Sequence, residues 1–554
     1  MSRQRVAVVT GGGRGIGAAV AEALARTGAH VVTVDPLVSL EGNVEPGAED
    51  EPTTADRILA SGGSAVASAA SVTEPAQLDA LFAGLVAEHG GVDAVVNVAG
   101  ITRPTSFSTG SWEDWSAVLR VHLDGYVHVL RAALDHMAPA GRGRILGVTS
   151  GAGWRPGDAG AYSCAKRAVA ALTWQVGAAA PPGVSVNALS PIALTRMVTA
   201  ALARHGGSER SGPTGAGPSS GGVRLGAGMP SAEEIAPLAA HLVDDGVDWL
   251  RGRVLFGAGA EVALVDPPRL VEVVDLGVPG RIAAVLDQIV PGALVPAHDR
   301  QSTTGGANPR FSQLGPTDPF RSDGGHVVVV ATGTDTADAV AALGRRGVQV
   351  STLDATGVDG FSAAVEGLGA VGNGPVDSVV VLGSEPTRTR SDDPIIQPDW
   401  RSVLGSHDGL AERILGDAVW ARAAAELAAR NGRPVRLTTV VPADTAGGRS
   451  RAQSAAQLAR AAVPGTEGRV TATALEVRPG ARPSDVGEVV AHLGVHPDAA
   501  GLSGAHLVLD AGWIGLCRHP RAGASLVHDG ARLPAWFDAA LRQMVGGDAA
   551  GDLS

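Results

Sequence analysis

Near its N-terminus, at residues 5–35, the chain reads RVAVVTGGGRGIGAAVAEALARTGAHVVTVD. The apolar, β-branched run Arg5–Thr10 predicts a strand, and the glycine-rich residues 11–17 predict a tight turn after it. Ala18–Thr27 is rich in alanine and predicts a helix, and Ala29–Val34 predicts a second strand. A strand, a helix and a strand in this order indicate a parallel βαβ unit.

Further strands are predicted at Val92–Val98 and Arg144–Thr149, with helices between them. The expected fold class is therefore α/β, with a Rossmann-type, doubly wound parallel sheet. The chain has 554 residues, which at about 100–200 residues per domain indicates two or more domains.

Composition and charge exclude several classes of protein. The formal net charge is −12, so the basic surface that nucleic acid requires is not expected. No apolar run reaches the roughly 18 residues of a membrane span, and the N-terminal residues resemble a strand rather than a signal peptide, so we expect a soluble, cytoplasmic chain with no membrane partner. Cys164 and Cys517 are too far apart in sequence to indicate a disulfide framework or a zinc site, and no metal is expected.

The second half of the chain repeats the plan of the first. His326–Val330 and Val348–Leu353 predict strands that correspond to the first two, and Asp399-Trp400 matches Asp114-Trp115. In the same register His122 falls on His407. The sequence therefore predicts two tandem Rossmann-type domains.

The domain boundaries follow from composition. We place the first domain at 1–294, with a core that ends near residue 265 and a tail, 266–294, packed on that core. A polar segment, 295–325, is the predicted linker, and 326–554 forms the second domain. The Gly-, Ser- and Pro-rich stretch 206–228 is too poor in apolar residues to build core and is predicted to be a mobile substrate flap.

The glycine-rich turn has the context of a nucleotide-binding loop, because it follows a strand and opens a helix, where backbone N–H groups approach a pyrophosphate. Asp35, at the end of the next strand, is placed to accept hydrogen bonds from the adenosine ribose and to repel a 2′-phosphate. NAD(H) is therefore favoured, and Arg14 keeps NADP(H) possible. The residues expected to line this part of the site are Gly11, Arg14, Gly15, Ile16, Gly17 and Asp35.

A candidate proton donor and acceptor lies further along the chain. Tyr162 and Lys166 are four residues apart and so share one face of a helix, and Lys166 is the only lysine in the chain. A nearby cation favours the phenolate and lowers the pKa of a phenol from about 10, which suits alcohol/ketone interconversion. Ser150 follows the strand 144–149 and is placed to hydrogen-bond the substrate oxygen, and Thr149 remains an alternative.

These motifs together resemble those of the classical short-chain dehydrogenases/reductases. The matching segments are Thr10–Gly17, Asn97-Val-Ala-Gly100, Ser150, Tyr162-x-x-x-Lys166 and Val186–Pro191. The resemblance implies that Tyr162 is the acid/base and that Ser150 steadies the carbonyl. It also implies that Lys166 holds the nicotinamide ribose and lowers the tyrosine pKa. Asn97, Ala99, Gly100 and Pro191 then belong to the cofactor site.

The chain departs from the family pattern at four places. The spacing from Ser150 to Tyr162 is one residue shorter than is common, and His122 stands where an Asn usually anchors the proton relay, so His122 is included among the catalytic candidates. Ala70 stands where an Asp commonly meets adenine, and Ile192 replaces a glycine. Within the family, the chain is most similar to the (3R)-hydroxyacyl-CoA dehydrogenase unit of peroxisomal multifunctional enzyme type 2, which has a similar insert at Pro36–Thr54.

The expected function is an NAD(P)-dependent oxidoreductase that interconverts a secondary alcohol and a ketone. The partner is a bulky small molecule, such as an acyl thioester or a sterol-like ketone. One alternative is an enzyme that recycles a tightly bound NAD during epimerisation or dehydration, and another is a non-catalytic NAD-binding scaffold. These alternatives differ in whether the cofactor turns over.

The second half lacks this chemistry. When Ala161–Lys166 is aligned with Ala452–Gln457, Gln453 and Gln457 replace the tyrosine and the lysine, and the glycines of the first loop are lost. We therefore expect a degenerate pseudo-domain that pairs with the first domain as an internal pseudo-dimer. The complete chain is expected to form a homo-oligomer, as a dimer of two-domain chains.

Overall fold

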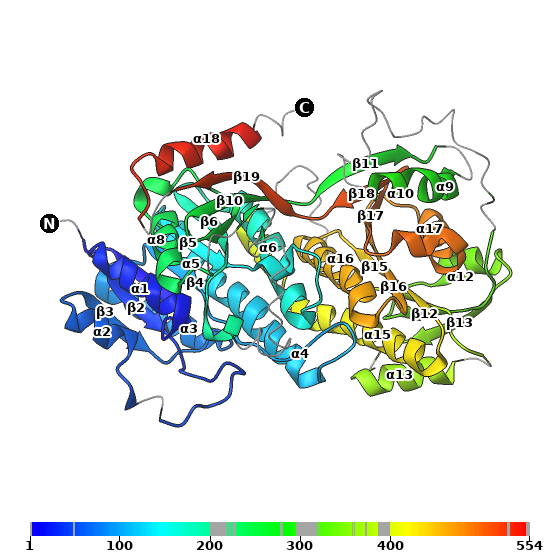
Figure 1. Cartoon of the computed structure of the whole chain (residues 1–554), viewed down its shortest axis with the longest axis horizontal. Coiled ribbons are helices and arrows are strands. Elements are labelled where there is room, and N and C mark those ends of the chain that lie inside the picture. The colour runs from blue at the N-terminus through cyan, green and yellow to red at the C-terminus, as the bar shows by residue number, and fades with distance from the viewer. Residues whose placement is uncertain are drawn as a thin grey trace, which may run out of the picture.

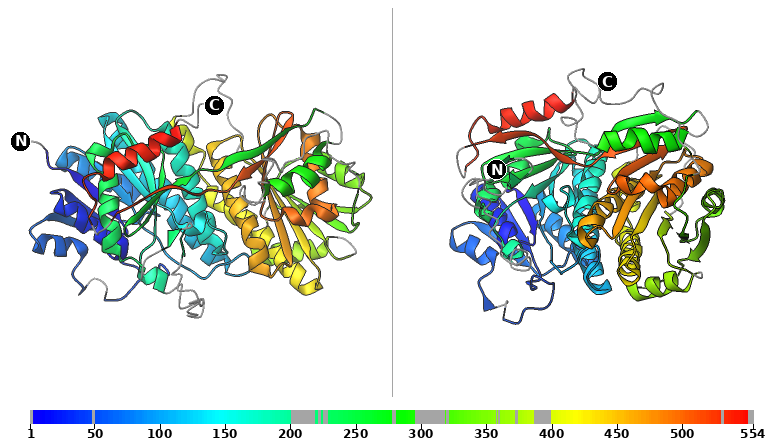
Figure 2. Two further views of the ribbon diagram at one scale, coloured as in Figure 1. Left: turned by 45° about the horizontal axis from the view of Figure 1, so that its top comes forward. Right: turned by 45° about the vertical axis from the view of Figure 1, so that its right-hand side comes forward.

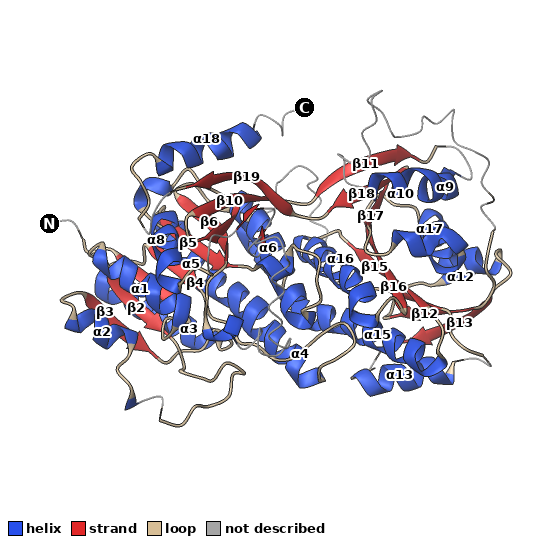
Figure 3. Ribbon diagram, viewed as in Figure 1, coloured by secondary structure: helices blue, strands red, loops and turns tan. Residues whose placement is uncertain are grey.

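The chain forms two α/β units that lie side by side, each with a sheet covered by helices on both faces (Figures 1 and 3). The computed structural model describes residues 3–47, 50–199, 219–220, 223–224, 229–277, 281–294, 318, 321–356, 358, 360–371, 374–385, 399–528 and 532–549. The predicted flap 206–228, apart from the short strands β7 (Ser219–Ser220) and β8 (Val223–Arg224), lies outside these residues, and so does most of the predicted linker 295–325.

The first sheet has nine strands within the described residues, and the seven from β3 to β9 in the order below run parallel. Its strands, in spatial order, are β19 (Arg521–Val527), β10 (Glu261–Asp266), β9 (Val254–Ala258), β6 (Val184–Pro191), β5 (Gly143–Val148), β4 (Ala94–Asn97), β1 (Val6–Thr10), β2 (His30–Val34) and β3 (Ser64–Ser68). All five residues of β1 are buried, as a central parallel strand covered on both faces requires. The strand order reverses between β1 and β4, where doubly wound sheets bind their ligands.

The second sheet has eight strands in the described part of the chain, and it repeats this order without a counterpart of β3. Its strands are β11 (Arg269–Asp275), β18 (Trp513–Arg518), β17 (His506–Asp510), β16 (Val470–Val477), β15 (Val435–Pro442), β14 (Ser378–Leu382), β12 (His326–Ala331) and β13 (Gln349–Asp354). The prediction of two doubly wound parallel sheets is confirmed. Each sheet also carries two antiparallel strands at one edge, which the sequence analysis did not predict.

Helices cover both faces of each sheet. On the first unit, one face carries α1 (Gly15–Arg26), α2 (Thr54–Ala60), α8 (Ala232–Leu242) and α18 (Phe537–Ala549), and the other carries α3 (Pro75–His89), α4 (Trp112–Leu119), the π-helical turn η2 (Arg120–Asp124), α5 (Gly125–Ala140) and α6 (Gly160–Ala179). On the second unit, one face carries α13 (Phe361–Ala370), α14 (Trp400–Gly405), α15 (Leu410–Asn431) and α16 (Ala446–Thr466), and the other carries α12 (Ala337–Gly344), α17 (Pro483–Val495), α9 (Arg281–Ala284), η5 (Val285–Ile289) and α10 (Val290–Leu294).

The two units exchange their edge strands. β11 follows β10 in the chain but pairs with β18 of the second sheet, whereas β19 follows β18 but pairs with β10 of the first (Figure 1). The segments after these strands cross over too, because α18 packs in the core of the first unit and α9–α10 pack in that of the second. The arrangement is an element swap within one chain.

This exchange corrects one expectation. The tail 266–294 does not pack on the first unit, because β11 and the helices after it complete the second. The sequence analysis missed the exchange because periodicity identifies a strand but not the sheet edge that it joins. A fragment that ends at residue 294 would lack β19 and α18, and so would not contain the whole first unit.

The two units share one apolar core where α6 packs against α16 (Figure 2). The Arg167 guanidinium donates to Gln453 Oε1 at 2.6 and 3.0 Å, and Gln175 donates to the Ser450 hydroxyl at 2.9 Å. Arg167 and Gln453 are both buried, so these hydrogen bonds satisfy polar groups that would otherwise destabilise the interface. Within the described residues, no helix is both long enough and apolar enough to cross a membrane.

Candidate functional site

The glycine-rich loop between β1 and α1 lines a cavity of about 550 Å³. Gly11 and Gly15 have φ angles of 64° and 56°, which glycine adopts without strain. A Cβ on Gly17 would lie 2.0 Å from the Gly11 carbonyl oxygen, whereas no atom lies within 4 Å of a Cβ placed on Gly15. The loop thus packs tightly against the helix and stays open toward the cavity. These are the features that a pyrophosphate at a helix N-terminus requires.

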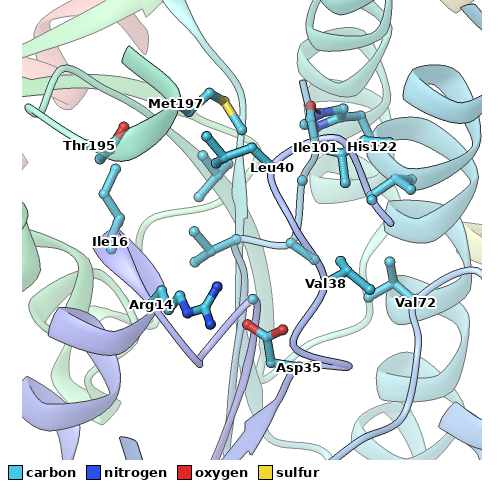
Figure 4. Close-up of a pocket in the computed structure, with 18 of the residues that line it drawn as sticks. Arg14, Ile16, Asp35, Val38, Leu40, Val72, Ile101, His122, Thr195 and Met197 are labelled. Carbon is cyan, nitrogen blue, oxygen red and sulfur yellow. Dashed lines mark hydrogen bonds between the residues drawn. The ribbon is translucent and has the colours of Figure 1, made fainter. Parts of the chain in front are cut away.

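Two carboxylates lie beside this loop. Asp35 follows β2, and its carboxylate accepts hydrogen bonds from the N–H groups of Gly13 at 2.9 Å and Leu37 at 2.8 Å. Arg14 pairs with Glu45 at 2.5 Å, and Figure 4 shows Arg14 and Asp35 at the same end of the cavity. The single guanidinium of the loop is therefore already engaged by a carboxylate from the insert 36–54.

Tyr162 and Lys166 lie in the first turns of α6 and also line the cavity. Tyr162 is next to His122, which Figure 4 shows at the opposite end from Arg14 and Asp35. Lys166 Nζ donates to the Val148 carbonyl at 2.6 Å and lies 5.8 Å from the centre of the Tyr162 ring. Burial lowers the pKa of Lys166 to about 7. Burial also raises the pKa of Tyr162, and a hydrogen bond with Ser150 offsets only part of that effect. The expected lowering of the tyrosine pKa is therefore outweighed, and the phenol is protonated at neutral pH.

The structure distinguishes the two candidate hydroxyls. Thr149 is 1% exposed and donates to the carbonyl oxygen of Lys166 at 2.7 Å, so its hydroxyl holds the backbone of α6. Ser150 lines the cavity with Tyr162 and acts to lower the pKa of that phenol, and its hydroxyl also accepts from the N–H of Ala152 at 3.3 Å. Ser150 is therefore the hydroxyl that faces the phenol.

His122 lies in η2, a π-helical turn between α4 and α5, and such turns are frequent at functional sites. Its ring is 5.1 Å from that of Tyr162 in an edge-to-face arrangement, and its Nε2 contacts the Ile101 carbonyl at 2.8 Å. Burial and the charge of Lys166 hold the pKa of His122 well below its usual value, so the ring is neutral. Its Nδ1 is buried and has no hydrogen-bond partner among the described residues.

Comparison with known proteins identifies the family. A family model for short chain dehydrogenases matches residues 5–205. The short-chain reductase protein NovJ of Streptomyces niveus is 35% identical, over 46% of this chain and 93% of its own length. The chain belongs to the short-chain dehydrogenase family. It is thus an oxidoreductase of a family that uses NAD(P)(H) and acts on small molecules.

Two further relatives of this short-chain dehydrogenase are a hydroxyacyl-CoA dehydrogenase and a peroxisomal multifunctional enzyme. Hydroxyacyl-CoA dehydrogenase ChsB1 of Mycobacterium tuberculosis is 33% identical, over 48% of this chain and 81% of its own length. Peroxisomal multifunctional enzyme type 2 of Mus musculus is 41% identical, over 30% of this chain and 22% of its own length. The similarity to the multifunctional enzyme that the motifs indicated is therefore confirmed.

Most of the predicted site residues line this same cavity. Those on its wall are Gly11, Arg14, Gly15, Ile16, Asp35, Ala99, Gly100, His122, Ser150, Tyr162, Lys166 and Pro191. Asn97 and Gly17 lie behind the wall. The side chain of Asn97 accepts a hydrogen bond from the Thr10 hydroxyl at 2.7 Å and so joins β4 to β1, and Gly17 packs against the loop.

Sequence analysis missed the wall that the insert 36–54 supplies. Leu37–Leu40 line the cavity, and Figure 4 shows Val38 and Leu40 among the residues that point into it. The Leu40 carbonyl accepts from the N–H of Thr102 at 2.7 Å, which holds the insert over the crevice. Thr195–Val198 form the facing wall. The unusual length of the insert was the available signal, but length alone does not show where a loop packs.

In the second unit, the alignment of Tyr162 and Lys166 needs a correction. Tyr162 and Lys166 lie 22 and 18 residues before Val184, the first residue of β6. The residues at these distances before Val470, the first of β16, are Gly448 and Ala452. The predicted counterparts Gln453 and Gln457 are thus five residues out of register.

Both glutamines lie in the interface between the units. Gln453 accepts from Arg167, and Gln457 donates to the carbonyl oxygens of Ala152 and Arg155 at 3.1 and 3.0 Å. The corrected register places neither a phenol nor an amine at the two positions. The equivalent residues are therefore not the two glutamines that the sequence analysis expected.

The contact of Gly17 leads to a prediction. Gly17→Ala is expected to weaken binding of the nicotinamide cofactor about tenfold to 100-fold, because the new Cβ displaces the Gly11 carbonyl and with it the loop. Gly84→Ala is the matched control, since Gly84 is also helical and no atom lies within 4 Å of its Cβ position. Calorimetric titration checks both, and equal affinities in the two variants would contradict the role given to the loop.

Proposed function

We propose that this enzyme interconverts a secondary alcohol and a ketone with NAD(H), and that Tyr162 is its proton donor and acceptor. The observation that carries the proposal is the meeting of the Tyr162 phenol, the Ser150 hydroxyl and the Lys166 amine at one end of a cavity. The glycine-rich loop and Asp35 lie at its other end. Proton transfer and dinucleotide binding are thus supported in one continuous space.

Each polar group has a part in the proposed reaction. The cofactor, when bound, supplies or accepts the hydride. In the reducing direction the Tyr162 phenol gives its proton to the ketone oxygen, and its raised pKa keeps that proton available at neutral pH. Ser150 donates a hydrogen bond to the same oxygen. In the oxidising direction the proton of the alcohol returns to the tyrosine.

Lys166 and His122 act on the tyrosine in this proposal. The Val148 carbonyl holds Lys166 Nζ beside the ring, and in its ammonium form Lys166 stabilises the phenolate and binds the cofactor ribose. His122 is neutral and keeps one unpartnered ring nitrogen, which accepts a hydrogen bond from water and so extends the path of the proton. In this proposal, the unpartnered ring nitrogen of His122 takes the place of the side-chain amide of the Asn that the family usually has at this position.

The charges beside the loop support NAD(H) over NADP(H). Asp35 and Glu45 are two carboxylates near the expected ribose position, and Arg14 is already paired with Glu45. A 2′-phosphate would bring further negative charge next to these two carboxylates, which repel it. The family includes users of either cofactor, so this preference rests on this chain's own residues.

Titration with both cofactors tests the preference. We expect NADH to bind at least about 100-fold more tightly than NADPH, at one site per chain. Asp35→Ala is expected to reduce that ratio, and Asp79→Ala, an exposed carboxylate on α3, is expected to leave it unchanged. A wild-type preference for NADPH, or two sites per chain, would contradict the proposal.

For the substrate, we propose a bulky acyl thioester with a 3-hydroxy or 3-oxo group. The support is the size of the cavity and the hydroxyacyl-CoA dehydrogenase among the relatives. The test is a panel of 3-oxoacyl thioesters and sterol ketones, with NADH consumption followed by absorbance. Steady net consumption with a thioester is the expected result. Turnover of substrate without net cofactor change would instead favour a recycled cofactor.

For the second unit, we propose a supporting role without catalysis. The register of α16 supports this, because it places Gly448 and Ala452 where α6 has Tyr162 and Lys166. α16 packs against α6, the helix that carries Tyr162 and Lys166. The proposed role of the second unit is therefore to hold this helix in place.

A further inference from the structure

A second cluster of ligand-type side chains lies far from the cavity, in the second unit. Asp287 comes from η5, His492 from α17, and His496 from the residue that follows α17. One ligand-type atom from each lies within 4.8 Å of the others. None of the three belongs to the proposed active site, and the spacing of the two cysteines had indicated no metal site.

The distances suit a small tetrahedral ion. Asp287 Oδ1 lies 2.9 Å from His492 Nε2 and 3.4 Å from His496 Nδ1. Ligands of zinc at about 2.0–2.2 Å are separated by about 3.3 Å in a tetrahedron. The two histidines are four residues apart, and their rings stack at 4.3 Å with planes 14° apart. One nitrogen of each ring lies close to the same Asp287 oxygen.

The hydrogen bonding also points to a missing ligand. His492 is 0% exposed, and neither its Nε2 nor Asp287 Oδ1 has a hydrogen-bond partner in the described part of the chain, although the two atoms are close. The close approach of these two atoms is therefore not made as a hydrogen bond between them. His496 Nδ1 accepts a weak hydrogen bond from the N–H of Asp498 at 3.4 Å, and a bound ion would take the place of that contact. Buried polar atoms without partners are rare and require an explanation.

We propose that Asp287, His492 and His496 bind a zinc ion. Two imidazoles and one carboxylate are a ligand set that zinc favours, with water in the fourth position. The Asp498 carboxylate is 3.9 Å from His496 Nδ1 and partly balances the charge of the ion. The site is independent of the proposed oxidoreductase activity.

The position of Asp287 indicates what the ion does. Asp287 lies on the exchanged segment after β11, whose helices α9 and α10 have only four and five residues. Helices this short gain little stability of their own. Zinc would bind this segment to α17 and so hold the exchanged element on the second unit.

Metal analysis of the full-length chain tests the site. We expect one zinc per chain after purification without chelator, and the visible absorption of tetrahedral cobalt when Co²⁺ replaces it. His492→Gln and His496→Gln are each expected to lose both signals. His89→Gln, at the end of α3 in the first unit, is the matched control and is expected to keep them.

Hydrogen exchange gives a second readout that does not depend on the variants folding well. In the wild-type chain, removal of zinc with a chelator is expected to speed exchange in residues 281–294 and to lower the melting temperature, and added zinc reverses both. The proposal is overturned if the wild-type chain neither contains nor binds zinc or cobalt, if iron occupies the site instead, or if the two histidine variants bind zinc as the wild type does.

Discussion

Tyr162→Phe is expected to reduce kcat by about 10³-fold, because it removes the only group proposed to pass a proton to the substrate oxygen. The substitution deletes one oxygen and leaves the ring that packs against His122 in place. The affinity for NADH is expected to change little, since the glycine-rich loop and Asp35 are untouched. Steady-state kinetics and calorimetric titration measure the two quantities separately.

Tyr126 supplies the matched control, since these are the two tyrosines of the chain. The Tyr126 ring is fully buried in α5, and its hydroxyl shares a hydrogen bond of 3.1 Å with Thr173. Tyr126→Phe is expected to keep kcat and to reduce the free energy of unfolding by about 1 kcal/mol. Equal activity in the two variants would mean that another group carries the proton.

The pH profile gives a further readout of the same proposal. Burial raises the pKa of Tyr162, so the proton donor stays protonated through neutral pH and loses its proton only in alkaline solution. Ketone reduction is therefore expected to fall as the pH rises through that pKa. Alcohol oxidation, which requires the deprotonated form, is expected to rise over the same range.

Arg451→Met is expected to destabilise the second unit by about 3–5 kcal/mol and to lower its melting temperature by about 10 °C. Arg451 is 5% exposed, and its guanidinium donates to both carboxylate oxygens of Asp417 at 2.8 and 3.0 Å and to Glu385 at 3.0 Å. Methionine fills a similar volume but leaves these buried carboxylates without their main cation. Calorimetry of the full chain measures the change.

Arg430→Met is the control for this prediction. Arg430 pairs with Glu426 on the exposed side of α15, with 59% of its side chain accessible, and such pairs contribute little. A change within about 0.5 kcal/mol is expected. If Arg451→Met were equally mild, the buried carboxylates would have to be protonated or solvated in the variant, and the account of this cluster would be wrong.

The local features of the first unit could be predicted from the sequence. The order of β1, the glycine-rich loop, α1 and β2 follows from apolar periodicity and from the positive φ angles that only glycine tolerates easily. The four-residue spacing of Tyr162 and Lys166 places both on one face of α6 for the same local reason. Such features depend on neighbours in sequence.

Features that depend on distant contacts could not be predicted. The phenol pKa is raised rather than lowered, because burial is a property of the whole fold and outweighs the neighbouring amine. Asn97 was expected on the cofactor wall, and its contact with Thr10 instead ties two strands together. The insert 36–54 lines the cavity because it packs on Thr102, a residue far away in sequence.

The division of the chain into two units likewise combines local features, which the sequence predicts, with distant contacts, which it does not. Sequence alone determined that the chain holds two doubly wound sheets and one set of short-chain dehydrogenase motifs, because strand order within a βαβ repeat and motif spacing are local. Three features depended on packing between distant parts of the chain. β11 and β19 change places, and Gly448 and Ala452, rather than the two glutamines, stand where α6 has Tyr162 and Lys166. Asp287 lies beside His492 and His496. An edge strand can satisfy its hydrogen bonds on either sheet, so the choice is made by packing over the whole molecule.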